Sequence, residues 1–469
     1  MPITVAFRTL GCRLNQCETA QMEESLTVRG LSTIPWEQRA DVRVLNTCTV
    51  TGKTDRACRN EIRRVKRADP ACRLIVTGCY AQVAPERIAE IAGVDLVLGN
   101  LDKAELPDHV DRLLSSAPSG PEATPGSAAP LDAAPGSAAL LKATPRRAAL
   151  QVTDYDNETA FRSDFVTHFS GYTRAFLKVQ NGCDARCSYC VIPIARGRSR
   201  SMPLADVLHQ VRMLEKKGFR EVVLTGIHLG CWGKDTGDGT LADLLRSLAT
   251  DTQMPHFRLS STEPLEVDDR VLAVMSTYGD RFAEHFHLPL QSGSDSVLRR
   301  MSRPYDTLQY AERARAVRSA FPDAAIGADV IVGFPGESEA EFQESMHLVE
   351  SLPLTYLHVF PYSDRPGTRA STAPDKVPPS TISERSARLR QLAEAKDAAF
   401  QARFAGRELR TLLLKQKSAD DMIVGLTGNY LEVQVPGDAS LMNRFARVVP
   451  LERRPDGRWL GSLVDVDSP

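Results

Sequence analysis

The stretch FLKVQNGCDARCSYC, residues 176–190, joins an apolar, β-rich run to three closely spaced cysteines. Cys183, Cys187 and Cys190 follow the run in the spacing CxxxCxxC. Three thiolates on one loop can ligate three irons of a 4Fe–4S cluster and leave the fourth iron without a protein ligand. Such an iron can bind a substrate, so the stretch predicts a reactive iron–sulfur centre at the end of a strand.

Other chemistries are known for closely spaced cysteines. Structural zinc takes four ligands, usually in two separated pairs, and this loop offers no fourth Cys or His. A redox-active CxxC pair leaves the third cysteine without a role. An iron–sulfur sensor without enzymatic activity does not need the series of strands and helices that continues after this loop.

Around this loop, from about residue 166, β-rich runs alternate with helical patterns. Six βα units of this kind predict an incomplete (β/α) barrel, with its chemistry at the C-terminal ends of the strands. A charged helix at roughly 380–403 ends this second domain, residues 166–403. The predicted strands are FLKVQN (176–181), EVVLTGI (221–227), HFRLSS (256–261), HFHLPLQ (285–291), AIGADVIVGF (325–334) and LHVFPY (357–362).

Residues 1–114 show the same alternation at shorter spacing and predict a parallel α/β domain. VAFRTL, DVRVLNT, RLIVTG and VDLVLGN are the predicted strands, with helices near 15–29, 54–68, 84–92 and 102–114. Residues 115–165 are rich in Ala and Pro and predict a linker or disordered insert. Short β-like runs over 404–469 predict a small all-β barrel.

A second set of cysteines lies in the first predicted domain. Cys12, Cys48 and Cys79 each follow directly on a predicted strand, in TLGC, LNTC and VTGC. Because the ends of parallel strands meet at one edge of a sheet, we expect the three thiols to converge and to hold a second cluster. The alternative is three small buried side chains that fill strand ends. Cys17, Cys58, Cys72 and Cys231 lack this placement and are interpreted as structural or incidental.

The composition fits a globular protein of several domains. The chain has 469 residues, a net charge of −1 and ten cysteines. It has no apolar run long enough to span a membrane and no secretory signal, so a cytoplasmic location is expected. In a reducing compartment, ten cysteines indicate metal or redox chemistry rather than disulfides.

Eight motifs together resemble the radical S-adenosylmethionine (SAM) methylthiotransferase family. The resemblance covers nearly the whole chain apart from residues 115–165. It implies an N-terminal cluster domain, a radical SAM barrel and a C-terminal RNA-binding TRAM domain. The motifs are TLGCRLNQCET, NTCTVT, TGCYAQ, NGCDARCSYCVIPIARGRSRS, LTGIHLG, PLQSGSDSVLRRM, DVIVGFPGE and VFPYSDRPGT.

The resemblance also implies cofactors and their ligands. Cys183, Cys187 and Cys190 would hold a radical-generating 4Fe–4S cluster, and Cys12, Cys48 and Cys79 an auxiliary one that carries the transferred sulfur. Tyr189 matches a position near the adenine of SAM, although a plain packing role is an equal alternative. Further SAM contacts are expected at Arg258, Ser260, Ser261, Gln291, Asp329 and Gly333, where strand-end polar groups can also be structural.

Members of the family add a methylthio group to C2 of an adenosine next to the tRNA anticodon, or to a ribosomal-protein aspartate. NQCET, LTGIHLG and VFPYS are most similar to the bacterial branch acting on N6-threonylcarbamoyladenosine. The isopentenyladenosine branch is the second alternative and the ribosomal-protein branch the third. The implied partners are the tRNA anticodon stem-loop, a low-potential electron donor and a sulfur donor. A radical methyltransferase or sulfur-inserting synthase is the rival enzyme class, although neither explains the cysteines ahead of the barrel.

Two basic segments are candidate RNA contacts. One predicted helix and its end carry many cations, which can bind phosphates or simply form a solvated face. Arg196, Arg198 and Arg200 follow the cysteine loop and suggest a role near cofactor or RNA. The cations of the helix are Arg56, Arg59, Arg63, Arg64, Lys66 and Arg67.

Overall fold

The computed structural model describes residues 3–115, 148–155, 158–162, 165–169 and 171–467. The chain divides into two compact units. The first comprises Met1–Asn15, Met22–Thr49 and Lys53–Asp154, and the second comprises Gln16–Gln21, Val50–Gly52 and Tyr155–Pro469. Within the described ranges, no helix is both long and apolar enough to cross a membrane.

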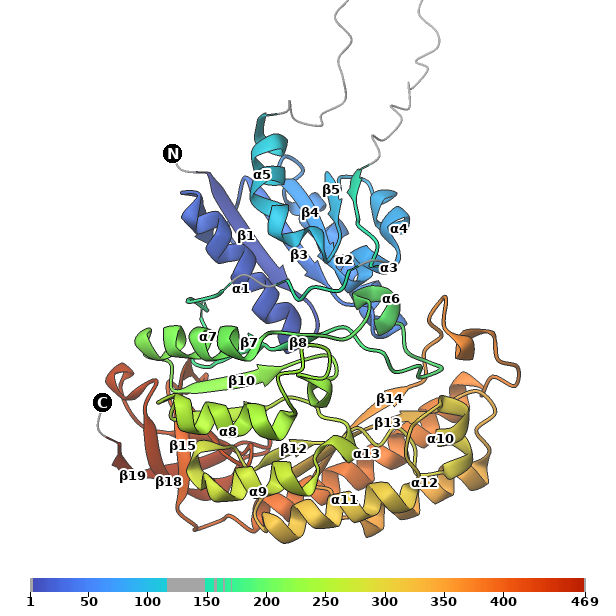
Figure 1. Ribbon diagram of the computed structural model, residues 1–469, viewed down its shortest axis with the longest axis vertical. Coiled ribbons are helices and arrows are strands. Elements are labelled where there is room, and N and C mark those ends of the chain that lie inside the picture. Colours follow the sequence, from blue (N-terminus) through green and yellow to red (C-terminus); the bar gives the residue numbers. More distant parts are fainter. Residues whose placement is uncertain (1–2, 116–147, 156–157, 163–164, 170, 468–469) are drawn as a thin grey trace, which may run out of the picture. The chain divides into compact units, whose positions relative to one another are not determined.

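A six-stranded, all-parallel sheet forms the centre of the first unit (Figure 1). Its strand order is β2-β1-β3-β4-β5-β6. The strands are β1 (Thr4–Thr9), β2 (Ser32–Ile34), β3 (Val42–Thr47), β4 (Arg73–Gly78), β5 (Leu96–Leu98) and β6 (Ala149–Gln151). The parallel α/β fold predicted for this part of the chain is therefore confirmed.

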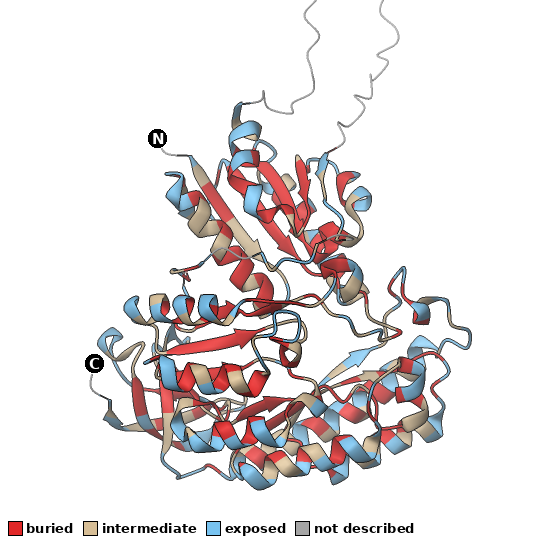
Figure 2. Ribbon diagram, viewed as in Figure 1, coloured by how far each residue is buried: buried red, intermediate tan, exposed pale blue. Residues whose placement is uncertain are grey.

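Helices cover both faces of this sheet. Leu45 and Val76 pack on one face with residues of α2, α3 and α4, while Val44 and Ile75 pack on the other with α1 and α5. Because neither face meets water, strands β3 and β4 are buried along their whole length (Figure 2). The helices are α1 (Arg13–Val28), α2 (Gly52–Ala68), α3 (Cys79–Val83), α4 (Pro85–Ala89) and α5 (Leu106–Ser115), with a 3-10 turn at Asp102–Glu105.

Two short strands of this sheet were not predicted. Strand β2 pairs with β1, and strand β6 pairs with β5. Strand β6 lies inside the segment expected to be a linker, of which residues 116–147 lie outside the described residues. Both strands span three residues, too few to show a period in the sequence, and only pairing with a neighbour defines them.

Six parallel strands form an open arc in the second unit, as predicted for an incomplete barrel. Two three-stranded sheets, β11-β10-β7 and β12-β13-β14, make up the arc. Hydrogen bonds from Ala283 N to Phe257 O (2.8 Å) and from Thr262 N to His287 O (3.0 Å) connect them. The strands are β7 (Ala175–Lys178), β10 (Glu221–Thr225), β11 (His256–Leu259), β12 (His285–His287), β13 (Ala325–Val332) and β14 (Tyr356–Pro361).

The two faces of the arc differ in chemistry. Phe257, Phe286 and Ile326 belong to the large apolar core that the helices cover. Successive side chains of a strand point to opposite faces. The residues next to these three, among them Arg258, His287 and Gly327, therefore face the concave side, and the even spacing places Asp329 there too.

Helices and two further short strands connect the arc. Capping boxes at Thr240, Asp306 and Ser338 begin α8, α11 and α12, which explains why these helices start where they do. Strands β8 (Gln180–Asn181) and β9 (Arg200–Ser201) pair antiparallel. The helices are α6 (Ile192–Arg196), α7 (Leu204–Lys216), α8 (Leu241–Asp251), α9 (Asp269–Thr277), α10 (Asp295–Met301), α11 (Thr307–Ala320), α12 (Glu339–Ser351) and α13 (Pro379–Ala402), with 3-10 turns at Leu229–Cys231, Pro264–Glu266, Gly279–Arg281 and Arg369–Thr372.

The C-terminal strands close into a five-stranded barrel, which confirms the predicted all-β architecture. Its core contains Val433 and Trp459 together with Phe400 and Phe404, which lie in and just after helix α13. The barrel therefore shares its core with the end of that helix. Its strands are β15 (Leu409–Lys417), β16 (Ile423–Thr427), β17 (Glu432–Val435), β18 (Phe445–Arg453) and β19 (Trp459–Val466), with a 3-10 turn at Ala439–Leu441.

Candidate functional site

The CxxxCxxC loop is held on both sides by backbone hydrogen bonds. Cys183 N donates to Gly197 O (3.0 Å), and Ser188 N donates to Met301 O at the end of α10 (2.9 Å). Gly182 has φ +74°, and a Cβ there would lie 1.8 Å from Arg198 O. Only glycine fits this approach, so the residue before Cys183 fixes the entry of the chain into the loop.

Two cationic side chains reach the sulfurs of this loop. Arg303 Nη1 donates to Cys187 Sγ (3.2 Å), and Arg303 also pairs with Glu263. His228 Nδ1 lies 3.5 Å from Cys183 Sγ. Burial lowers the pKa of His228, but its hydrogen bonds, the one to Cys183 first, outweigh burial and raise that pKa to about 12. Arg303 therefore supplies a charged hydrogen bond to sulfur, a common way to tune iron–sulfur sites.

The distances between the cysteine sulfurs can be compared with those expected around a single zinc ion. Two groups of three donor atoms within 4.8 Å of one another exist among the described residues, and neither contains a cysteine of either set. Thiolates around one tetrahedral zinc lie only about 3.8 Å apart, given a Zn–S distance of about 2.3 Å. In each set, at least one pair of sulfurs is therefore more than 4.8 Å apart, which is wider than expected around one zinc ion. All ten cysteines are described, and none forms a disulfide.

The second cysteine set lies at the carboxyl ends of three neighbouring strands, β1, β3 and β4. Cys12 immediately precedes α1, Cys48 follows β3, and Cys79 is the first residue of α3. The register pairs Thr47 with Gly78, so Cys48 and Cys79 are the next residues on adjacent strands. The structure thus brings all three cysteines to one edge of the sheet, as the sequence predicts.

Close backbone packing shapes this edge. Gly11 has φ +112°, and a Cβ there would lie 2.5 Å from Cys48 Cβ and 2.9 Å from its Sγ. The buried Asn15 amide donates to Leu10 O (3.1 Å) and to Thr47 O (3.0 Å), which ties the turn after β1 to the end of β3. Cys48 can therefore occupy its position only because residue 11 has no side chain.

Four of the predicted SAM contacts lie around the concave face of the arc. Tyr189 packs against Met301 and Phe334, and burial raises its pKa well above the ordinary value. Ser260 Oγ is buried without a hydrogen-bond partner. Gln291 has φ +66° and bridges to β13, and Gly333 N donates to Glu337 Oε2 (2.7 Å).

The other three predicted contacts are engaged with protein groups. Arg258 is fully buried, and its guanidinium bonds Glu221 (3.0 Å) and the carbonyl oxygens of Thr427 (3.1 Å) and Gly428 (2.9 Å). These bonds connect β11 to the C-terminal barrel. Ser261 and Asp329 both contact His287.

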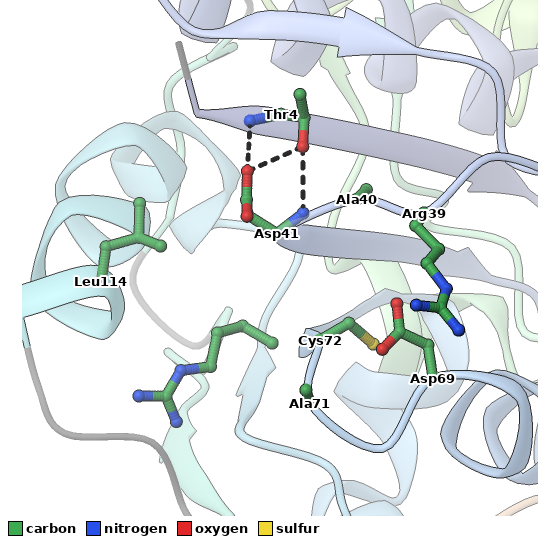
Figure 3. Close-up of a pocket in the computed structure, with 9 residues that line it drawn as sticks. Thr4, Arg39, Ala40, Asp41, Asp69, Ala71, Cys72 and Leu114 are labelled. Atoms are coloured by element: carbon green, nitrogen blue, oxygen red, sulfur yellow. Dashed lines mark hydrogen bonds between the residues drawn. The ribbon is translucent and has the colours of Figure 1, made fainter. Parts of the chain in front are cut away.

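A hollow of about 370 Å³ lies at the opposite edge of the first sheet (Figure 3). Its lining includes Thr4 at the start of β1, Asp41 just before β3 and Arg73 at the start of β4. These are the amino ends of the strands, whereas Cys12, Cys48 and Cys79 follow the carboxyl ends. The hollow is therefore not part of the cysteine site.

The two basic segments differ in exposure. Arg56, Arg63 and Arg67 of α2 are exposed. By contrast, Arg196 is fully buried and pairs with Glu18 (2.5 Å), and Arg200 is 3% exposed. A direct contact of Arg196 or Arg200 with RNA phosphates is therefore excluded in this conformation, while Arg198 is exposed. This pairing was not predictable from the sequence because Glu18 is far from residue 196 along the chain.

Two family models match this chain, one in each unit. Residues 4–99 match the uncharacterized protein family UPF0004, and residues 177–349 match the radical SAM superfamily. Among solved structures, the radical S-adenosylmethionine methyltransferase TsrM from Kitasatospora setae has a TM-score of 0.50 and 16% identity. That similarity covers 79% of this chain and 77% of the other, and it supports the fold alone.

Curated relatives extend over nearly the whole chain. The threonylcarbamoyladenosine tRNA methylthiotransferase MtaB of Aquifex aeolicus is 38% identical over 92% of this chain and 97% of its own. The protein of the same name in Bacillus subtilis is 35% identical over 95% and 93%. A tRNA-2-methylthio-N(6)-dimethylallyladenosine synthase of Methylobacillus flagellatus is 31% identical over 96% of both chains.

Proposed function

The chain belongs to the tRNA methylthiotransferase family, and we propose that it adds a methylthio group to C2 of N6-threonylcarbamoyladenosine in tRNA. The relatives with that printed activity are 32–38% identical to it, more than the 31% of the dimethylallyladenosine synthase. The single structural observation that carries the proposal is the convergence of Cys12, Cys48 and Cys79 at one sheet edge, in a chain that also carries the CxxxCxxC loop.

The residues at the two sites fit the cofactors of a radical SAM enzyme. Each site offers three thiols, the donor set that a 4Fe–4S cluster with one open iron needs. In each cluster, the fourth iron would then have no protein ligand. The buried and unpartnered Ser260 Oγ supplies a polar atom for a bound molecule on the concave face. When bound, an iron–sulfur cluster and SAM supply the one-electron chemistry that an unactivated C–H position requires.

The chain's own residues then have distinct tasks. Cys183, Cys187 and Cys190 hold the radical cluster, and Arg303 and His228 donate hydrogen bonds to its ligands. Cys12, Cys48 and Cys79 hold the auxiliary cluster. We assign the orientation of SAM and the exclusion of water to Tyr189, Ser260, Gln291 and Gly333. The other three predicted contacts, Arg258, Ser261 and Asp329, are engaged with protein groups and are not assigned to SAM.

The outer domains complete the proposal. We assign residues 1–114 to the auxiliary-cluster domain, 166–403 to the radical SAM domain and 404–469 to a TRAM domain that binds RNA, with residues 115–165 as a connecting insert. The partners are the anticodon stem-loop of tRNA, a low-potential electron donor and a sulfur donor, and the location is the cytoplasm.

The test compares three forms of the reconstituted protein. Wild type should contain about eight irons and convert unthiolated tRNA to the 2-methylthio form. The triple variant Cys12→Ala, Cys48→Ala, Cys79→Ala should keep about four irons and reductive SAM cleavage but lose methylthiolation. Cys72→Ala is the matched control, because Cys72 lies in the same unit but lines the hollow at the opposite edge.

Mass spectrometry of the tRNA nucleosides decides between the branches. Gain of 2-methylthio-N6-threonylcarbamoyladenosine supports the proposal. Methylthiolation of isopentenyladenosine instead would assign the chain to the second branch, and full activity in the triple variant would refute the role of the three cysteines.

A further inference from the structure

Two histidines and one aspartate meet on the concave face of the arc. His287 is the last residue of β12, while Asp329 lies in β13 and His358 in β14. The register pairs Asp329 directly with His358 on adjacent parallel strands. One donor atom from each of the three residues lies within 4.8 Å of the other two.

The distances match the spacing of ligands around one metal ion. Asp329 Oδ1 lies 3.2 Å from His287 Nε2 and 3.2 Å from His358 Nδ1. Ligands at about 2.0–2.1 Å from an ion lie about 2.9 Å apart at octahedral angles and about 3.4 Å apart at tetrahedral angles. The observed separations fall between these two values.

The imidazole of His287 provides a second, independent observation. Its side chain is 8% exposed, and its Nε2 has no hydrogen-bond partner although Asp329 Oδ1 is only 3.2 Å away. The ring nitrogen is therefore not directed at the oxygen as in a hydrogen bond. An unpartnered buried nitrogen next to a carboxylate oxygen is the arrangement expected when both face a common ion.

The neighbours of the triad support the same interpretation. Ser261 Oγ bonds His287 Nδ1 (2.8 Å), which orients the ring and leaves Nε2 toward Asp329. A hydrogen bond to the second ring nitrogen is usual for metal-binding histidines.

A second group with three donors lacks these properties. His228, Cys231 and Glu266 also lie within 4.8 Å of one another. The ammonium of Lys234 lies 3.6 Å from both Cys231 Sγ and Glu266 Oε1 and already occupies the place of a cation. In the described part of the chain, no lysine or arginine pairs with Asp329 in the same way.

We propose that His287, Asp329 and His358 bind one divalent transition-metal ion, with Zn²⁺ as the probe that identifies the site. Two histidines and a carboxylate form the ligand set of open zinc and non-haem iron sites, which keep positions for a further oxygen or nitrogen ligand. His358 is 55% exposed, so the ion remains accessible from solvent. The site is additional to the two iron–sulfur clusters and needs neither of them.

Zinc binding to the full chain tests the site. Wild type, His287→Gln and His358→Gln are dialysed against buffered Zn²⁺, and bound zinc per chain is measured by elemental analysis. All variants carry the same ten cysteines, so zinc held by thiols cancels in the comparison. His347→Gln, an exposed histidine on α12, is the matched control.

The expected result is one zinc per chain more in wild type and His347→Gln than in the two triad variants. Removal of the supporting hydroxyl in Ser261→Ala should weaken zinc binding by about 10–100-fold. Equal zinc content in all variants overturns the proposal. Because His358 is half-exposed, His358→Gln keeps the test decisive if His287→Gln does not fold. The readout is independent of tRNA methylthiolation, so failure of this site and failure of the proposed function are distinguishable.

Discussion

At the scale of single residues, Cys48 of the second cysteine set packs tightly against Gly11. A methyl group at residue 11 would lie 2.5 Å from Cys48 Cβ. We expect Gly11→Ala to displace Cys48 and to lower the iron content from about eight to about four per chain. Iron analysis after reconstitution measures this, together with the electron paramagnetic resonance signal of the remaining cluster.

Gly30→Ala is the control for this prediction. Gly30 also has a positive φ of +83°, but a Cβ there meets nothing within 4 Å. Both variants carry backbone strain of about 1 kcal/mol, and only Gly11→Ala adds a clash with a proposed ligand. An unchanged iron content in Gly11→Ala would show that Cys48 does not ligate a cluster.

Arg303 gives a second prediction at this scale. Its charged hydrogen bond to Cys187 stabilises the more negative, reduced state of a cluster ligated there. We expect Arg303→Gln to lower the reduction potential of that cluster by about 65–130 mV. This range follows from about 1.5–3 kcal/mol for a charged hydrogen bond and about 59 mV per tenfold change in the equilibrium constant of a one-electron reduction.

A redox titration followed by electron paramagnetic resonance measures the potential. Arg299→Gln, at an exposed arginine of α10 four residues before Arg303, should leave it unchanged. Arg303→Lys keeps a charge and should fall between wild type and Arg303→Gln. A potential that is the same in all four proteins would mean that Arg303 only packs against the loop.

Sequence reasoning identified the six cysteines that we propose as cluster ligands and missed the residues that position them. All six cysteines could be identified because each set has a local signature, a spacing or a strand end. Asn15, His228 and Arg303 could not, since their partners lie on distant segments. Arg258 lies within a predicted strand, but its pairing with Glu221 and the barrel depends on the tertiary structure.

At the scale of elements, helix α2 presents its cations unevenly. Arg59 bonds Tyr80 Oη, and Lys66 pairs with Asp95, so these two are already used within the unit. Arg56, Arg63 and Arg67 are exposed and are the candidates for phosphate contacts. The solvated basic face remains the alternative for this part of the helix.

The salt dependence of tRNA binding separates the two interpretations. Each lost phosphate contact should reduce the slope of log affinity against log salt by about 0.7–0.9. We therefore expect Arg63→Gln with Arg67→Gln to lower both the affinity and the slope. Arg315→Gln on α11 is the control, and an unchanged slope in the double variant would assign this part of α2 to a solvated face.

The order of strands and helices was largely predictable from the sequence, because strands buried on both faces give continuous apolar runs. The missed strands, β2, β6 and β9, are two or three residues long and are defined only by pairing with a neighbour. The number of strands in the arc and their parallel direction were also predictable. The pairing of charged residues on its concave face could not be predicted. Arg258 pairs with Glu221 and Asp329 with His358, and in both pairs the two residues lie on different strands.

At the scale of the whole molecule, helix α13 and the C-terminal barrel depend on one shared core. Phe404 is fully buried there with Trp459 and Val433. We expect Phe404→Ala to lower the free energy of unfolding by about 3–5 kcal/mol. Calorimetry should show a lower melting temperature, whereas Leu451→Ala, at a side chain 61% exposed on β18, should change it little.

The shared core also affects how RNA binding by the barrel is tested. Deleting residues 405–469 would uncover Phe400 and Phe404 and remove the carbonyl partners of Arg258. A loss of tRNA affinity after deletion would then combine unfolding with lost contacts. Substitution of an exposed barrel residue such as Arg447 separates the two effects.

The two cysteine sets also differ in the stage of folding at which their thiols come together. Cys183, Cys187 and Cys190 are neighbours in sequence, so closing their loop costs little chain entropy and requires little of the fold. Cys12, Cys48 and Cys79 meet only after β1, β3 and β4 have paired, across a much longer span of chain. During maturation, the first set can therefore receive iron early, whereas the second must wait until the sheet has folded.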